Sequence, residues 1–275
     1  MNHNDNFVFS ARSLQDYLDC PRRFYLRYIR NISWPAIPGD PILEIEENLH
    51  NGRQFHQLAC QFLSGIPEEL LNNRTKGSPL REWLSTFIDY VNTLQIGTAF
   101  VEETLVTELN GRQIQARYDL IFQDHDGSIS IIDWKTTGAE PRKSFLQEKM
   151  QTIIYPFILA ESLEELFPGN RFDERIINMR YWYVNYPRII VEFTHGEKEQ
   201  IENRKILSEL ISEIINKEPD DFSKTKDKSL CRFCTYRSLC ERGSLAGVLT
   251  GHKTELDLDD LTIDFDNIGD FEFGN

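Results

Sequence analysis

Two aspartates and a lysine are the residues whose types and spacing point most directly to chemistry. Asp119 lies in a stretch rich in Ile, Phe and Tyr, and Asp133 and Lys135 lie in a second such stretch, residues 128–136. The Asp-Gly pair at residues 126–127 is a turn signal, so we predict a β-hairpin. Alternation along a strand places Asp133 and Lys135 on one face, and hairpin pairing can bring Asp119 beside Asp133. Such a group could hold a hard divalent cation and polarise a water molecule.

The alternative is that this Asp-x-Lys pair is only a solvated polar surface. Ile129 and Ile131 share the face of Asp133 and Lys135, so the face changes abruptly from apolar to charged. Burying two like charges together is unfavourable unless a cation compensates them. The pattern by itself suggests a cation site at the end of the strand but does not decide between the two interpretations.

Three cysteines form a compact group, Cys231-x2-Cys234-x5-Cys240. Three thiolates leave a tetrahedral metal ion or a cubane cluster one ligand short. Cys20, at a helix break, is the preferred fourth ligand, whereas Cys60 lies on an apolar helical face and resembles a buried small side chain. By spacing alone, zinc and an iron–sulfur cluster are equally compatible with this set.

Composition indicates one large domain, because the chain has 275 residues, of which 40% are apolar and 12% aromatic. No apolar run approaches the roughly 20 residues that span a bilayer, so we expect no membrane partner. The first residues lack the pattern of a signal peptide. We therefore expect a cytoplasmic protein whose thiols stay reduced and bind metal.

Charge is unevenly distributed along the chain. Of the net charge of −14, residues 253–275 hold −7, with eight acids and one lysine. We interpret this segment as an acidic, disordered tail that increases solubility, with a role in interactions as the alternative. Basic residues cluster nearer the two ends, which is compatible with a local basic groove on an otherwise acidic protein. They are Arg22, Arg23, Arg27, Arg30, Lys224, Lys226, Lys228, Arg232 and Arg237.

The elements expected around these residues define an α/β fold with a central mixed sheet flanked by helices. Ser13 to Asp16 resembles a helix capping box, and Pro21 ends that helix or begins the next. Further helices are predicted over residues 45–63, 80–94, 149–166 and 197–215, with strands over residues 100–136 and 176–193.

Together, these motifs resemble the RecB-type PD-(D/E)XK nuclease superfamily, in particular its iron–sulfur branch. That branch includes AddB-type nuclease domains and CRISPR-associated RecB-like exonucleases. The resemblance covers residues 9–242, with Tyr118 where the family name implies proline. The matching segments are SARSLQDYLDCPRRFYLRYI with Cys20, Gly52-x-x-x-His56, Tyr118-Asp119, Asp133-Trp134-Lys135, Gln151-x-x-x-Tyr155, and Cys231, Cys234 and Cys240.

For the fold, the resemblance implies a restriction-endonuclease-like core over residues 1–252, followed by the tail. It also implies a [4Fe–4S] cluster that joins the N- and C-terminal segments. The implied cluster ligands are Cys20, Cys231, Cys234 and Cys240.

For the active site, the resemblance implies Mg²⁺ or Mn²⁺ held by side chains and by the backbone carbonyl of Trp134. Lys135 would orient the attacking water, and Gln151 and Tyr155 would position the DNA backbone. A packed polar pair is the alternative for Gln151 and Tyr155, as is a core histidine for His56. Glu102 is the acid on the preceding strand, with Glu103 less favoured. The implied catalytic and metal-binding set is His56, Glu102, Asp119, Asp133, Trp134 and Lys135.

The expected function is a metal-dependent DNA exonuclease that acts on single strands or ends in recombinational repair. The sequence contains no Gly-x-x-x-x-Gly-Lys-[Ser/Thr] motif, so a helicase would be a separate partner. One alternative is a CRISPR-adaptation exonuclease that trims spacer precursors beside an integrase. Others are a non-catalytic DNA-binding scaffold and a zinc-stabilised interaction module.

Overall fold

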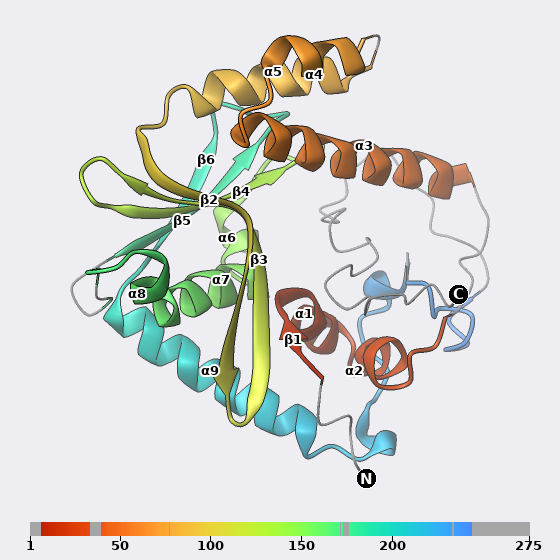
Figure 1. Ribbon diagram of the computed structural model, residues 1–275. Helices are drawn as coiled ribbons and strands as arrows, with labels where there is room; N and C mark the ends of the chain where they lie inside the picture. Colours follow the sequence, from red (N-terminus) through yellow and green to blue (C-terminus); the bar gives the residue numbers. More distant parts are fainter. Residues whose placement is uncertain are drawn as a thin grey trace, which may run out of the picture.

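The computed structural model describes residues 7–33, 40–76, 78–170, 172, 176–232 and 234–243, with the side chains of residues 40–46 left out (Figure 1). The predicted acidic tail, residues 253–275, lies outside these ranges. Within them, no helix is both long and apolar enough to cross a membrane.

A six-stranded mixed sheet forms the centre of the molecule, as predicted. The strand order is β1-β3-β4-β5-β6, and β2 also pairs with β3. The β1–β3 and β4–β5 pairs are parallel and the others are antiparallel. The strands are β1 (Phe9–Ser10), β2 (Ile96–Leu109), β3 (Arg112–Asp124), β4 (Ile129–Lys135), β5 (Ile177–Tyr183) and β6 (Ile190–His195).

β2 and β3 form a long hairpin that extends beyond the rest of the sheet (Figure 1). Its turn is Asn110-Gly111, where both residues have positive φ angles, 54° and 69°. An Asn-Gly pair adopts these angles readily, and the resulting turn matches the right-handed twist of the two strands. The turn also touches the last long helix, since Asn110 Nδ2 donates to the carbonyl of Ser208 at 2.9 Å.

Helices cover both faces of the sheet and create two apolar cores. One core lies against α3 (Asp40–Leu63) and α5 (Leu80–Val91), which pack on Trp134 and Trp182. The other core lies against α1 (Ala11–Asp19), α7 (Met150–Glu161) and α9 (Glu197–Ile215). The short helices are α2 (Pro21–Phe24), η1 (Tyr25–Ile29), α4 (Glu68–Arg74), α6 (Lys143–Leu146), α8 (Leu163–Leu166), η3 (Pro219–Asp221) and η4 (Lys228–Cys231).

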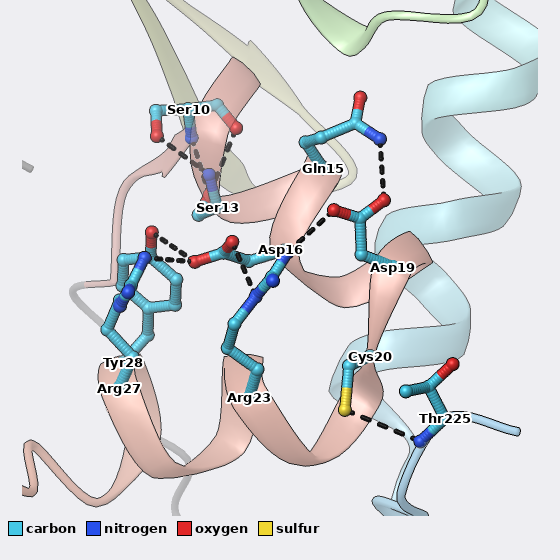
Figure 2. Close-up of polar contacts among 10 residues, drawn as sticks. All are labelled: Ser10, Ser13, Gln15, Asp16, Asp19, Cys20, Arg23, Arg27, Tyr28 and Thr225. Carbon is cyan, nitrogen blue, oxygen red and sulfur yellow. Dashed lines mark hydrogen bonds and ion pairs between the residues drawn. The ribbon is translucent and has the colours of Figure 1, made fainter. Parts of the chain in front are cut away.

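The predicted capping box at Ser13 was wrong by one turn. Ser10 is the N-cap of α1: its Oγ accepts from the Ser13 N–H at 3.2 Å, and Ser13 Oγ accepts from the Ser10 N–H at 2.8 Å (Figure 2). The physical reason is that the chain leaves β1 extended at Ser10, so the helix begins directly after it. Asp16 is buried and instead pairs with Arg23 at 2.8 Å and Arg27 at 2.6 Å.

The C-terminal part of the described chain returns to the N-terminal helices (Figure 1). The Arg22 N–H donates to the carbonyl of Ser223 at 3.0 Å, and Tyr236 Oη donates to the carbonyl of Ile32 at 2.9 Å. The two ends therefore meet on one side of the sheet, where the predicted cysteine ligands lie.

Candidate active site

Asp119 on β3 is the centre of the candidate site. The pairing of β3 with β4 ends at Leu120 and Ile132, so Asp119 and Asp133 are the next residues at the open end of the hairpin. Asp119 Oδ2 accepts from the Trp134 N–H at 3.0 Å, and Asp119 Oδ1 lies 3.0 Å from His56 Nδ1. The carboxylate is thus held in place by β4 on one side and by α3 on the other.

Three side chains from different elements can hold a metal ion here. One ligand atom each of His56, Glu102 and Asp119 lie within 4.8 Å of one another. In the described part of the chain, no other group of three His, Cys, Asp or Glu residues is as compact. An imidazole nitrogen and two carboxylate oxygens suit Mn²⁺, and the carboxylates also suit Mg²⁺.

Glu102 reaches this group through an unusual backbone conformation. Its neighbours Val101 and Glu103 pair with Leu120 and Tyr118, so Glu102 lies across from Asp119. Its φ angle is 54°, in the left-handed region that residues other than glycine rarely adopt. Such strain persists where surrounding contacts impose it. Glu102, not Glu103, is therefore the acid that faces Asp119.

The electrostatics of Glu102 favour a cation. Burial raises the pKa of Glu102, and the nearby Asp119 carboxylate raises it further. Arg117 opposes this shift through an ion pair with Glu102 at 2.6 Å. A divalent ion between the two carboxylates would relieve their repulsion. Arg117 was not predicted from the sequence, because nothing local marks it as the partner of an acid on the neighbouring strand.

Asp133, Lys135 and Gln151 form a second, contiguous group. Lys135 Nζ lies 3.1 Å from Asp133 Oδ2 and donates to Gln151 Oε1 at 3.1 Å. Gln151 Nε2 donates in turn to Asp133 Oδ1 at 2.5 Å. Asp133 and Lys135 are only 5% and 4% exposed, so the charge of Lys135 is neutralised within the protein. Gln151 thus contacts both Asp133 and Lys135. The direct metal contact of Asp133 stays a prediction.

Tyr155 lies one helical turn after Gln151 and packs against the sheet. Its ring centroid is 5.0 Å from that of Tyr118, and Tyr118 Oη donates to the carbonyl of Tyr155 at 2.8 Å. Tyr118, which replaces the proline of the family name, therefore fastens α7 to β3. The roles predicted for Tyr155 in positioning DNA and for the Trp134 carbonyl in metal binding stay predictions.

Close packing at Gly52 explains why glycine suits the first position of the Gly-x-x-x-His motif. A Cβ on Gly52 would lie 2.9 Å from Oγ1 of Thr136, the residue that follows Lys135. With a larger residue at this position, either the Thr136 side chain or α3 would have to shift. Gly52 lies one turn before His56, so this close packing also sets the distance from His56 to Asp119.

Gly52→Ala is expected to lower the cleavage rate about tenfold, because pushing α3 outward displaces His56 from Asp119. The free energy of unfolding should change little, since alanine favours the helix while the contact opposes it. Single-turnover cleavage and thermal unfolding of the variant measure both effects. Gly138→Ala is the matched control, because a Cβ there meets no atom within 4 Å. An active Gly52→Ala enzyme would contradict the steric explanation.

The four cysteines predicted as ligands line one cavity. The Thr225 N–H donates to Cys20 Sγ at 3.4 Å, and burial raises the pKa values of the Cys234 and Cys240 thiols. No three of the sulfurs come within 4.8 Å of one another, so they form no compact metal site. Cys60 does not line this cavity. The basic side chains in its wall are Arg23, Lys224, Arg237 and Arg242.

A protein-family comparison agrees with this geometry. Residues 8–241 match the PD-(D/E)XK nuclease superfamily, and the chain belongs to that superfamily. It is therefore a nuclease of the PD-(D/E)XK type, a class that uses divalent metal ions. The iron–sulfur branch and the AddB-like subtype stay predictions.

Solved structures of similar proteins include a candidate exonuclease from Eubacterium rectale. It is 10% identical, with a TM-score of 0.47 over 76% of this chain and 80% of that chain. A second, SSO0001, is 13% identical, with a TM-score of 0.36 over 87% of each chain. Both TM-scores are below 0.5, so the assignment rests on the family match. No protein with a curated function matches the chain.

Proposed function

We propose that this protein is a Mg²⁺- or Mn²⁺-dependent exonuclease that hydrolyses DNA from ends. The observation that carries the proposal is the compact group of His56, Glu102 and Asp119 beside the buried Asp133–Lys135 pair. A scaffold that only bound DNA would have no need to bury a lysine against a carboxylate at the edge of a cation site.

The residues divide into two sets of roles in this proposal. His56, Glu102 and Asp119 would hold the metal ion, and Asp133, at the same open end of the hairpin as Asp119, would complete its ligands. A bound divalent ion would lower the pKa of a water molecule and offset charge that develops on the phosphodiester. Lys135 would orient the attacking water and stabilise the transition state. Gln151 would keep the Lys135 ammonium in place between these groups.

We also propose a [4Fe–4S] cluster on Cys20, Cys231, Cys234 and Cys240. In support, all four line one cavity, and its basic wall suits the negative charge of a thiolate-bound cluster. No three of these sulfurs lie within 4.8 Å of one another, so the proposal rests on the shared cavity and its basic wall. The cluster would fasten together segments that the chain separates by about 200 residues.

The resemblance to AddB-type domains supports a role in recombinational repair with a separate helicase. Such a helicase would deliver single strands to the nuclease.

Cleavage of end-labelled linear DNA, single- and double-stranded, tests the nuclease. Protein purified without oxygen should degrade the DNA in the presence of either Mg²⁺ or Mn²⁺. Cleavage should stop when EDTA is added, since chelation removes the metal. Covalently closed circles, which have no ends, should stay intact. Asp119→Asn protein purified in parallel excludes a contaminating nuclease. Cutting of closed circles would show an endonuclease, and an inactive, folded wild type would contradict the proposal.

A further inference from the structure

The first turn of α7 carries Gln151 and is held in part by Thr152, whose Oγ1 donates to the carbonyl of Leu146 at 2.6 Å and lies 2.8 Å from Tyr181 Oη. The N-cap of α7, Lys149, makes no side-chain capping hydrogen bond. Pro156 lies inside the helix and has no N–H, so the carbonyl of Thr152 lacks its usual helical partner. A helix end weakened in this way depends on contacts from other elements.

Gln15 on α1 supplies such a contact. Its Oε1 accepts from the N–H of Met150, the first residue of α7, at 3.0 Å, across 135 residues of chain. The same side chain is oriented from within α1, because its Nε2 donates to Asp19 Oδ1 at 3.0 Å (Figure 2). Asp19 is fixed in turn by Arg23 Nη2 at 2.6 Å. The amide nitrogen is thus engaged with Asp19, and the oxygen is left to face α7.

The contact lies next to the catalytic groups. Met150, which Gln15 binds, directly precedes Gln151, whose amide holds Lys135 and Asp133. A rotation of the first turn of α7 would move the Gln151 amide and weaken its hydrogen bonds to Lys135 and Asp133. The buried side chain of Met150 holds α7 against the core. The hydrogen bond from the Met150 N–H to Gln15 opposes rotation of the helix.

We propose that Gln15 is a positioning residue for the nuclease reaction. It holds the first turn of α7 so that Gln151 stays on Lys135 and Asp133. This inference rests on the proposed function, but the contact itself can be tested without cleavage. Gln15 touches neither the metal ligands nor Lys135, so it acts through α7 alone.

Gln15→Leu is the principal test variant, because leucine removes the acceptor at similar size. Amide exchange at Met150 and Gln151 should become about tenfold faster, and kcat should fall about tenfold, the effect of one lost hydrogen bond. The Mn²⁺ concentration for half-maximal activity should not change, since His56, Glu102 and Asp119 lie elsewhere. Hydrogen–deuterium exchange and steady-state kinetics measure these quantities.

Two further variants separate positioning from general stability. Gln15→Glu keeps an oxygen acceptor for the Met150 N–H, but it loses the bond to Asp19 and repels that carboxylate, so it should recover exchange protection and kcat only in part. Gln123→Leu is the control: Gln123 donates to the carbonyl of Gly127 at 3.4 Å at the far end of β3, and its loss should leave kcat unchanged.

Three outcomes decide the inference. Unchanged exchange at Met150 in Gln15→Leu would overturn it, as would faster exchange with unchanged kcat, which would reduce Gln15 to a structural role. If the wild type cleaves no DNA, the proposed function fails separately. Faster exchange in Gln15→Leu would then still support the hold of Gln15 on α7.

Discussion

Asp119→Asn is expected to lower the rate of DNA cleavage about a thousandfold or more and to abolish Mn²⁺ binding. The substitution removes one of the two carboxylates in the group with His56 and Glu102. Asparagine keeps an oxygen that can accept from the Trp134 N–H, so the local structure should persist. Calorimetric Mn²⁺ titration and single-turnover cleavage measure the two losses.

Stability provides an independent check on the same variant. Without metal, Asp119 repels Glu102, whose pKa it raises. Removing that charge should leave the thermal midpoint of metal-free protein equal to or above that of the wild type. Asp124→Asn, at the last residue of β3, is the matched control and should bind Mn²⁺ and cleave normally. An Asp119→Asn protein that still binds Mn²⁺ would move the metal site elsewhere.

Cys234→Ser is expected to remove the iron from protein purified without oxygen and to lower its thermal midpoint by about 10 °C or more. The wild type should contain about four iron atoms per chain and be brown. The physical reason is that the proposed cluster joins Cys20 to the C-terminal segment, which is otherwise held by hydrogen bonds and by the buried rings of Phe222 and Tyr236. Metal analysis, absorption spectra and thermal unfolding give the three quantities.

Cys60→Ser is the control for this prediction, because Cys60 lies on α3 and does not line the cavity. It should keep its iron, its colour and its midpoint. One zinc per wild-type chain would overturn the cluster and establish a structural zinc. Unchanged iron in Cys234→Ser would show that Cys234 is not a ligand.

The hairpin that carries Asp119, Asp133 and Lys135 was predictable because its rules are local. Side chains alternate along a strand, and a Gly-containing turn sets the register of the two strands. The antiparallel pairing of β3 with β4 confirms the hairpin. The last long helix, residues 197–215, also matches its prediction, because its apolar residues recur with a helical period along one continuous segment.

Local patterns failed where a side chain had two possible partners. Ser13 resembled an N-cap followed by Asp16, but the true N-cap is Ser10, and Asp16 is buried between Arg23 and Arg27. The predicted helix over residues 149–166 is divided at Ser162 into α7 and α8. Propensity is a weak signal at such points, and packing decides them.

The sequence by itself determined which residues were predicted to do the chemistry: Asp119, Asp133 and Lys135, and the cysteines. Only the tertiary structure decided which acid joins them, because alternation allows either Glu102 or Glu103 and the pairing with β3 selects Glu102. Likewise, Gln151 meets Lys135, and Gln15 meets α7, through contacts between elements far apart in the chain. Spacing along a chain predicts what lies on one face of one element, whereas contacts between elements depend on how the whole core packs.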